Sequence, residues 1–206
     1  MARFLVTAGP TREPIDPVRF LSNRSSGRMG YAVCNALLEL NHEVILISGP
    51  VNLDVPVGVK FEQVETAEDM LSASLKYWRS CDGLFATAAV SDYRLVETYS
   101  EKLKRENSSL QLDLVPNPDI VKTLADSRGK NQLLIGWALE SESGLVNAKQ
   151  KLKSKQLDFI CLNSPISQNS EVAELTVIGN CGLEEHLGPY CKDELARKLI
   201  DIVLPA

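Results

Sequence analysis

The chain has 206 residues, of which 44% are hydrophobic and 24% are charged, and its formal net charge is -5. This composition is typical of a globular protein with a buried core, and the acidic balance gives no general attraction to nucleic acid or to an anionic membrane. No apolar run reaches the roughly 18 residues that a membrane helix needs, and the N-terminus has no signal-peptide pattern. We therefore expect a cytoplasmic protein that binds neither nucleic acid nor membrane.

The cysteines and histidines exclude several kinds of chemistry. Five cysteines are widely spaced and never form C-x-x-C, so neither a disulfide framework nor a zinc site is predicted. Cys34 and Cys161 lie in apolar patterns and are expected to pack in the core. His42 and His186 are expected in turns, in contexts that suggest neither a ligand nor a base. Histidine-based catalytic triads are therefore disfavoured.

Buried strands and amphipathic helices alternate along the chain. Apolar or alternating runs predict strands at 4–8, 43–48, 60–64, 83–90, 110–115, 133–137 and 158–163, with one arm of a late hairpin at 174–179. Helical spacing predicts helices that begin near Ser25–Gly27, after N-caps at Thr66 and Asn117, and before Leu145 and Leu195. The alternation indicates an α/β fold: a doubly wound, mainly parallel, Rossmann-like sheet with helices on both faces and a small β-hairpin extension.

The connection between the first strand and the first helix is unusually long, about eighteen residues, and long loops of this kind are usually functional. It ends at Ser25–Gly27, where free backbone N–H groups at a helix start favour an anion, most naturally a phosphate. The alternative is a plain Ser N-cap on a core helix. The second strand is followed by Ser48-Gly49-Pro50 without the acidic residue of a nicotinamide site, which argues against NAD.

Two charged segments each allow two interpretations. Residues 92–109 follow a central strand and are either a solvated loop or a mobile basic flap over phosphates. Lysines at 149–155 close a helix, and we interpret them as complementing the negative helix end rather than as a nucleic-acid patch.

Polar segments follow several predicted strands and would share one edge of a parallel sheet. The resulting pocket lacks a protein nucleophile and a base that titrates near neutral pH. It suits the electrostatic chemistry of nucleotidyl or phosphoryl transfer, usually with Mg²⁺ on the phosphates. The residues expected there are Arg19, Asn23, Asp92, Lys102 and Lys104.

The sequence resembles the phosphopantothenate-cysteine ligase family from about residue 5 to 163. The shared motifs are T-A-G-P-T-R-E-P-I-D-P-V-R-F-L-S-N-R-S-S-G-R-M-G (7–30), A-A-V-S-D-Y (88–93), K-L-K-R (102–105), N-P-D-I (117–120) and G-W-A-L-E-S (136–141). The resemblance implies a stand-alone bacterial ligase of coenzyme A synthesis, one nucleotide-binding domain over residues 1–206. CTP with Mg²⁺ would activate 4'-phosphopantothenate as an acyl-cytidylate, and L-cysteine would then form the amide.

The resemblance also implies roles for individual residues. Asn23 would hold the acyl intermediate, Arg19 would lie near the reacting acyl group, and Lys102 would cover the triphosphate, supported by Lys104 and Arg105. The implied nucleotide-binding residues are Gly9, Ser25, Ser26, Gly27, Ala88, Ala89, Asp92 and Trp137.

The chain departs from the family pattern in a few places. Trp137 and Leu139-Glu140-Ser141 stand where the family often has Phe and Ala-Glu-Thr. A later A-N-D-V motif of the family appears here as Leu162-Asn163-Ser164-Pro165, so only its Asn163 carries over. The metal ligands are not assigned. A homodimer is expected from the family. The alternatives are an inactive nucleotide-binding regulatory protein and an NAD(P)-dependent oxidoreductase.

Overall fold

The computed structural model describes residues 1–105, 109–139, 144–163 and 172–205. Four residues of the family motifs lie outside the described residues: Glu140, Ser141, Ser164 and Pro165. Part of the charged segment 92–109 lies outside them as well.

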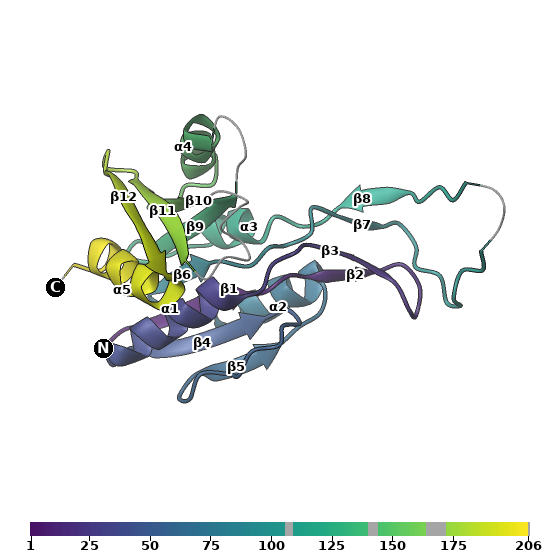
Figure 1. The fold of residues 1–206 in the computed structure, drawn as a ribbon, viewed down its shortest axis with the longest axis horizontal. Helices are drawn as coiled ribbons and strands as arrows, with labels where there is room; N and C mark the ends of the chain where they lie inside the picture. The colour runs from purple at the N-terminus through teal and green to yellow at the C-terminus, as the bar shows by residue number, and fades with distance from the viewer. Residues whose placement is uncertain (106–108, 140–143, 164–171, 206) are drawn as a thin grey trace.

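The central sheet has eight strands in the order β12-β11-β10-β9-β6-β1-β4-β5 (Figure 1). The parallel strands are β1 (Arg3–Ala8), β4 (Glu43–Ser48), β5 (Lys60–Gln63), β6 (Gly83–Ala86), β9 (Leu133–Leu139) and β10 (Phe159–Asn163). β11 (Val172–Gly179) and β12 (Glu184–Cys191) add an antiparallel hairpin at one edge. The predicted fold, with its late hairpin, is confirmed.

Helices cover both faces of the sheet. On one face, α1 (Arg28–Glu39) and α5 (Lys192–Val203) pack in a buried cluster with β1, β4 and the edge hairpin. On the other face, α2 (Ala67–Trp78), α3 (Ile120–Asp126) and α4 (Gly144–Ser154) bury a second cluster. Alternate residues of β1 belong to the two clusters, since Val6 lies in the first and Leu5 in the second. The near-continuous apolar strands therefore reflect burial on both faces.

An arm projects from the body beyond the ends of β1 and β6 (Figure 1). It contains two antiparallel pairs, β2 (Arg12–Pro14) with β3 (Phe20–Ser22), and β7 (Tyr93–Leu95) with β8 (Leu114–Pro116). Backbone hydrogen bonds join its halves, with the Tyr99 N–H donating to the Ile15 carbonyl over 2.9 Å. The long first loop is thus a hairpin, which the sequence did not indicate because its strands are only three residues long and prolines lie in and around them.

Several predicted boundaries were wrong. The strand expected at 83–90 ends at Ala86, and the one expected at 110–115 begins only at Leu114. α3 is capped by Asp119, whose side chain accepts from the Lys122 N–H, and not by Asn117. Thr66 caps α2 as predicted, in a reciprocal box with Asp69.

The cysteines and histidines have structural roles. Cys34 and Cys161 are buried, as predicted, and burial raises the pKa of both thiols. His42 follows α1, accepting from the Ala2 N–H, whereas His186 lies in β12 and not in a turn. Among the described residues, no helix is long and apolar enough to cross a membrane.

Candidate functional site

A cleft of about 780 Å³ opens where the strand order reverses, at the carboxyl ends of β1 and β6. From β1 the chain adds β4 and β5 on one side of the sheet and then β6, β9 and β10 on the other, so the strand order reverses between β1 and β6. Ligands of open α/β sheets bind at such a point. Eight residues expected at the site line the cleft: Asn23, Ser25, Ser26, Gly27, Ala88, Ala89, Asp92 and Trp137. The sheet topology thus brings segments far apart in the sequence to one place.

Two loops continue the pairing of β1 and β6 beyond the strand ends, and one of them, residues 87–92, lines the cleft. The Ala89 N–H donates to the Gly9 carbonyl over 2.9 Å, and the Thr11 N–H donates back to the Ala89 carbonyl over 3.3 Å. The Ser91 N–H then donates to Thr11 Oγ1 over 2.9 Å. These hydrogen bonds explain why β6 is shorter than predicted, because residues 87–91 pair with a loop rather than with a strand.

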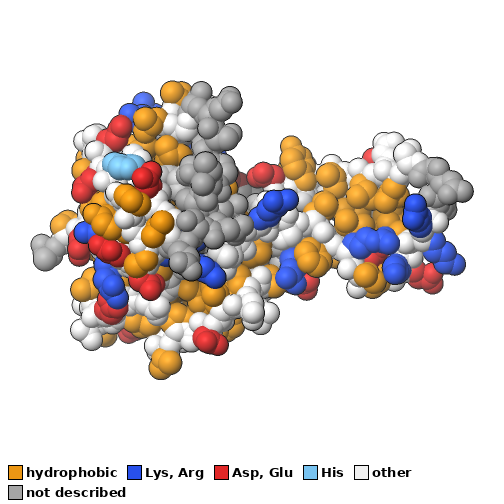
Figure 2. Space-filling model, viewed as in Figure 1, with side chains coloured by type: hydrophobic (Ala, Val, Ile, Leu, Met, Phe, Trp, Pro, Cys, Tyr) orange, Lys and Arg blue, Asp and Glu red, His pale blue; other side chains and the backbone are white. Residues whose placement is uncertain are grey.

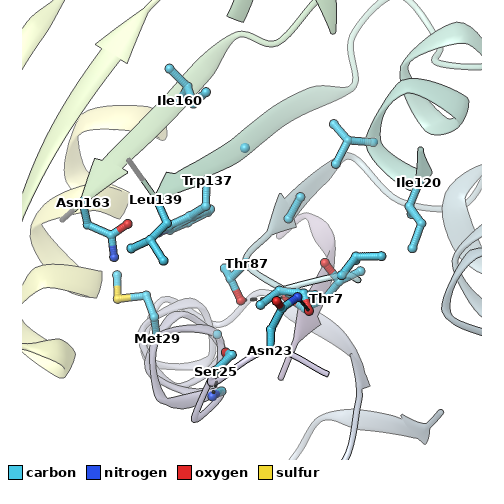
Figure 3. Close-up of a pocket in the computed structure, with 18 of the residues that line it drawn as sticks. Thr7, Asn23, Ser25, Met29, Thr87, Ile120, Trp137, Leu139, Ile160 and Asn163 are labelled. Carbon is cyan, nitrogen blue, oxygen red and sulfur yellow. Dashed lines mark hydrogen bonds between the residues drawn. The ribbon is translucent and has the colours of Figure 1, made fainter. Parts of the chain in front are cut away.

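Asn23 is held by the same pair of loops, through the Ala89 carbonyl. Its Nδ2 donates to the Ala89 carbonyl over 3.0 Å, although the residue is exposed at the cleft. One amide N–H is therefore occupied, while Oδ1 and the second N–H are oriented with it. Figure 3 shows Asn23 and Ser25 on one side of the cleft, and Trp137, Leu139 and Asn163 on the other.

The N-terminus of α1 reaches the cleft without a side-chain cap. Gly27 is the N-cap residue, with a φ of 75° that favours glycine, and neither Ser25 nor Ser26 caps the first turn. Ser25 Oγ instead accepts from the Gly27 N–H over 3.3 Å. The Ser N-cap alternative is therefore not observed, and the backbone N–H groups with the positive helix end remain available to an anion.

Gly30 lets α1 lie directly against the strand ends. A Cβ at this position would overlap the Thr87 hydroxyl and lie 2.5 Å from Ala8 Cβ. Thr87 Oγ1 donates to the Thr7 carbonyl over 2.7 Å, which ties the two central strands together below the helix. The close approach places the helix start over the switch point.

The opposite wall carries an orphan donor. Trp137 lies on β9, and its Nε1 is buried with no hydrogen-bond partner among the residues that the structure describes. A buried polar group without a partner is costly. A phenylalanine at the same position would carry no such donor.

A third side of the cleft includes lysines whose role the sequence did not indicate. Lys151 of α4 and Lys155, which directly follows this helix, were interpreted above as complementing the helix end. Both line the cleft, and Lys155 pairs with Asp119 at 2.9 Å. Asn117 also belongs here, and its Nδ2 donates to the Ser91 carbonyl over 2.8 Å. Only the packing of α4 against the sheet shows which way its lysines face.

Within the described part of the chain, basic side chains outnumber acidic ones around the cleft. The lining cations are Arg24, Arg28, Lys151, Lys155 and Lys192, and the lining carboxylates are Asp92, Asp119 and Glu174. Burial, and then the charge of Arg28, lower the pKa of Lys192. In a protein with a net negative charge, this local excess favours an anionic ligand.

Four of the predicted site residues do not line the cleft. Gly9 lies behind Gly27, where a Cβ built on Gly27 would come within 3.4 Å of the Gly9 Cα. Arg19, Lys102 and Lys104 lie on the arm, and Arg19 Nη1 pairs with Asp16 at 2.8 Å. Within one chain, these three basic residues of the arm are therefore not part of the cleft wall.

The fold and the cleft define an open, doubly wound α/β domain with an anion-favouring site at its switch point. The chain belongs to the family described as the DNA/pantothenate metabolism flavoprotein C-terminal domain, whose model matches residues 1–205. It is 43% identical over 207 residues to the coenzyme A biosynthesis bifunctional protein CoaBC of Vibrio cholerae, covering 98% of this chain and 52% of the relative. The chain spans about half the length of the curated relatives it matches.

Solved structures agree with this assignment. The C-terminal domain of a CoaBC protein superposes with a TM-score of 0.85 at 38% identity, covering 98% of this chain and 93% of that one. A Cab2 mutant in complex with phosphopantothenate-cysteine has the same fold, with a TM-score of 0.82 at 15% identity over 98% of this chain and 85% of that one.

The close approach at Gly30 can be tested by adding one methyl group. We expect Gly30→Ala to lower the free energy of unfolding by about 1–2 kcal/mol, because overpacking against Thr87 and Ala8 outweighs the gain in helix propensity. Urea denaturation measures it. The control is Gly129→Ala, where the nearest atom to the added Cβ lies 3.6 Å away. Equal stability of the two variants would contradict the close contact.

Proposed function

We propose that this domain, residues 1–206, joins 4'-phosphopantothenate to L-cysteine in coenzyme A biosynthesis, in the cytoplasm, as a CTP-dependent ligase. The observation that carries the proposal is Asn23, fixed by the Ala89 carbonyl beside the uncapped N-terminus of α1 in the cleft. Membership of the family, with a relative named for coenzyme A biosynthesis, supports it, as does the phosphopantothenate-cysteine bound in the Cab2 structure.

The proposed reaction needs no protein nucleophile. A carboxylate oxygen of phosphopantothenate attacks the α-phosphorus of CTP, and pyrophosphate leaves. The amine of cysteine then attacks the acyl carbon, CMP leaves with the bonding electrons, and the amine loses a proton. Both attacking groups belong to substrates, so the protein contributes alignment and stabilisation of negative charge.

The cleft offers groups for each part of this chemistry. The uncapped backbone N–H groups in the first turn of α1 and the helix dipole suit phosphate oxygens. The loop at Ala88–Asp92 suits the base and ribose, and the fixed amide of Asn23 suits the acyl intermediate. Lys151 and Lys155 add positive charge on the side of α4.

Magnesium fits this site as a partner of the nucleotide. In the described part of the chain, no group of three or more His, Cys, Asp or Glu could hold a metal. Mg²⁺ commonly binds through one or two carboxylates and substrate phosphates, and Asp92 is a carboxylate on the cleft wall. When bound, the ion would neutralise charge on the triphosphate.

We further propose a homodimer in which the arm of one subunit lies over the cleft of its partner. Arg19 lies between β2 and β3, Lys102 lies between β7 and β8, and neither lines the cleft of its own chain. Figure 2 shows hydrophobic side chains gathered on the arm. Its exposed apolar residues are Val18, Phe20, Tyr93, Val96, Tyr99, Leu110 and Leu114. Contact with a second copy would bury them.

The two alternatives have less support. An NAD(P)-dependent oxidoreductase would need an acidic residue after β4, and that strand ends at the buried Ser48 with Gly49 and Pro50 behind it. An inactive binding protein would not need the amide of Asn23 held at the cleft.

The first test is pyrophosphate release by the purified protein with Mg²⁺. We expect release with CTP to depend on 4'-phosphopantothenate, because its carboxylate is the attacking group, and to exceed release with ATP. Omission of phosphopantothenate is the control. Lack of phosphopantothenate-dependent release with either nucleotide would reject the ligase in favour of the inactive binding protein.

Asn23 can be tested by separating the two half-reactions. Asn23→Asp should still release pyrophosphate but form the amide at least tenfold more slowly, because a carboxylate would repel the acyl-cytidylate that the amide holds. Single-turnover measurement of pyrophosphate and of the amide product distinguishes the steps. Asn131→Asp, at a surface turn away from the cleft, is the matched control. Equal losses in both steps would contradict the role.

The shared site can be tested by mixing two impaired proteins. If Asn23 and Lys102 act across the dimer, co-expressed Asn23→Asp and Lys102→Gln subunits should recover about a quarter of the wild-type rate. Half of the dimers would be mixed, and each would hold one intact site of two. No recovery in dimers verified to be mixed would place both residues in the same subunit's site.

A further inference from the structure

The arm contains a buried carboxylate that no step of the reaction uses. The Asp16 side chain is 0% exposed, at the turn between β2 and β3. Its Oδ1 accepts from the Val18 N–H over 2.8 Å and from the Arg19 N–H over 2.9 Å, which closes the turn. Its Oδ2 accepts from Arg19 Nη1 over 2.8 Å and from the Leu103 N–H over 3.1 Å.

The hydrogen bond from the Leu103 N–H to Oδ2 joins the turn to a segment 87 residues further along the chain. Leu103 is held at both of its backbone groups, since its carbonyl also accepts from Arg19 Nη2 over 3.2 Å. On either side of Leu103, Lys102 and Lys104 are exposed. The backbone between the two lysines is therefore the part of this segment that is tied to the β2–β3 turn.

We propose that Asp16, completed by Arg19, is a positioning residue that clips Leu103 to the turn and so presents Lys102 to the triphosphate. The inference rests on the proposed function for the role of Lys102, whereas the clip itself rests on the contacts of Leu103. Asp16 touches no substrate. Arg19 acquires through it a structural role beside the one implied near the acyl group.

The electrostatics of the clip agree with a permanently charged carboxylate. Burial by itself raises the pKa of Asp16, but hydrogen bonds from three backbone N–H groups and the charge of Arg19 lower it overall. Charge-assisted hydrogen bonds are roughly twice as strong as neutral ones. The clip is therefore formed throughout the pH range in which the enzyme would work.

Asp16→Asn tests the clip with almost no change in shape. If the amide oxygen keeps the turn, the amide NH₂ faces the Leu103 N–H and the Arg19 guanidinium, which are also donors. If the amide is reversed, the turn loses its acceptor instead. Asp113→Asn is the control, because it removes the same charge from an exposed residue of the arm.

Trypsin provides a measurement that needs no substrate. It cleaves after Lys102, Lys104 and Arg105, and a segment must detach to enter the protease. We expect Asp16→Asn to be cut there about tenfold faster than the wild type and Asp113→Asn, as expected for loss of charge-assisted hydrogen bonds. Cleavage after the exposed Lys130 should be unchanged, which shows that the whole protein has not been destabilised. Unchanged cleavage at residues 102–105 would overturn the clip.

Kinetics then connect the clip to Lys102. We expect Asp16→Asn to lower kcat/KM for CTP about tenfold with no change in KM for cysteine, and to add little in a Lys102→Gln background because it acts through that side chain. Independent, multiplying losses would show that Asp16 does not position Lys102. Faster cleavage in a protein without any ligase activity would support the clip and reject the proposed function.

Discussion

The site depends on the extension of the β1–β6 pairing into the loops that follow these strands. Ala89 is central, because its N–H donates to the Gly9 carbonyl and its own carbonyl accepts from both the Thr11 N–H and Asn23 Nδ2. Parallel neighbours bring their carboxyl ends to the same edge, so two loops from distant parts of the sequence can pair there. A side chain on an exposed loop is thereby held as firmly as one on a strand.

Local signals in the sequence predicted the elements that depend on local interactions. The strand at 43–48 was located to the residue, and the N-cap at Thr66 was correct, because apolar period and capping chemistry are both short-range. The errors arose where a tertiary contact competes. Asn117 resembles an N-cap, but its side chain binds the Ser91 carbonyl, and Asp119 caps α3 instead.

The residues at strand ends were the part of the site that the sequence predicted. The segment of Ala88, which follows β6, and the end of β9 with Trp137 meet at the cleft because the topology requires it. The lysines of α4 could not be placed, since the helix orientation depends on packing over the whole face of the sheet. Nor could Arg19 and Lys102, because their distance from the cleft is set by an arm whose strands are three residues long.

The arm shows how a buried charge can order a loop before any ligand binds. Ordering a loop when substrate binds costs conformational entropy, which is subtracted from the affinity. A carboxylate without partners in the same position would destabilise the fold. Asp16 avoids that cost because every donor around it is aimed at its two oxygens. The conformational entropy of the Leu103 backbone is then lost during folding, while the lysines on either side of it remain exposed.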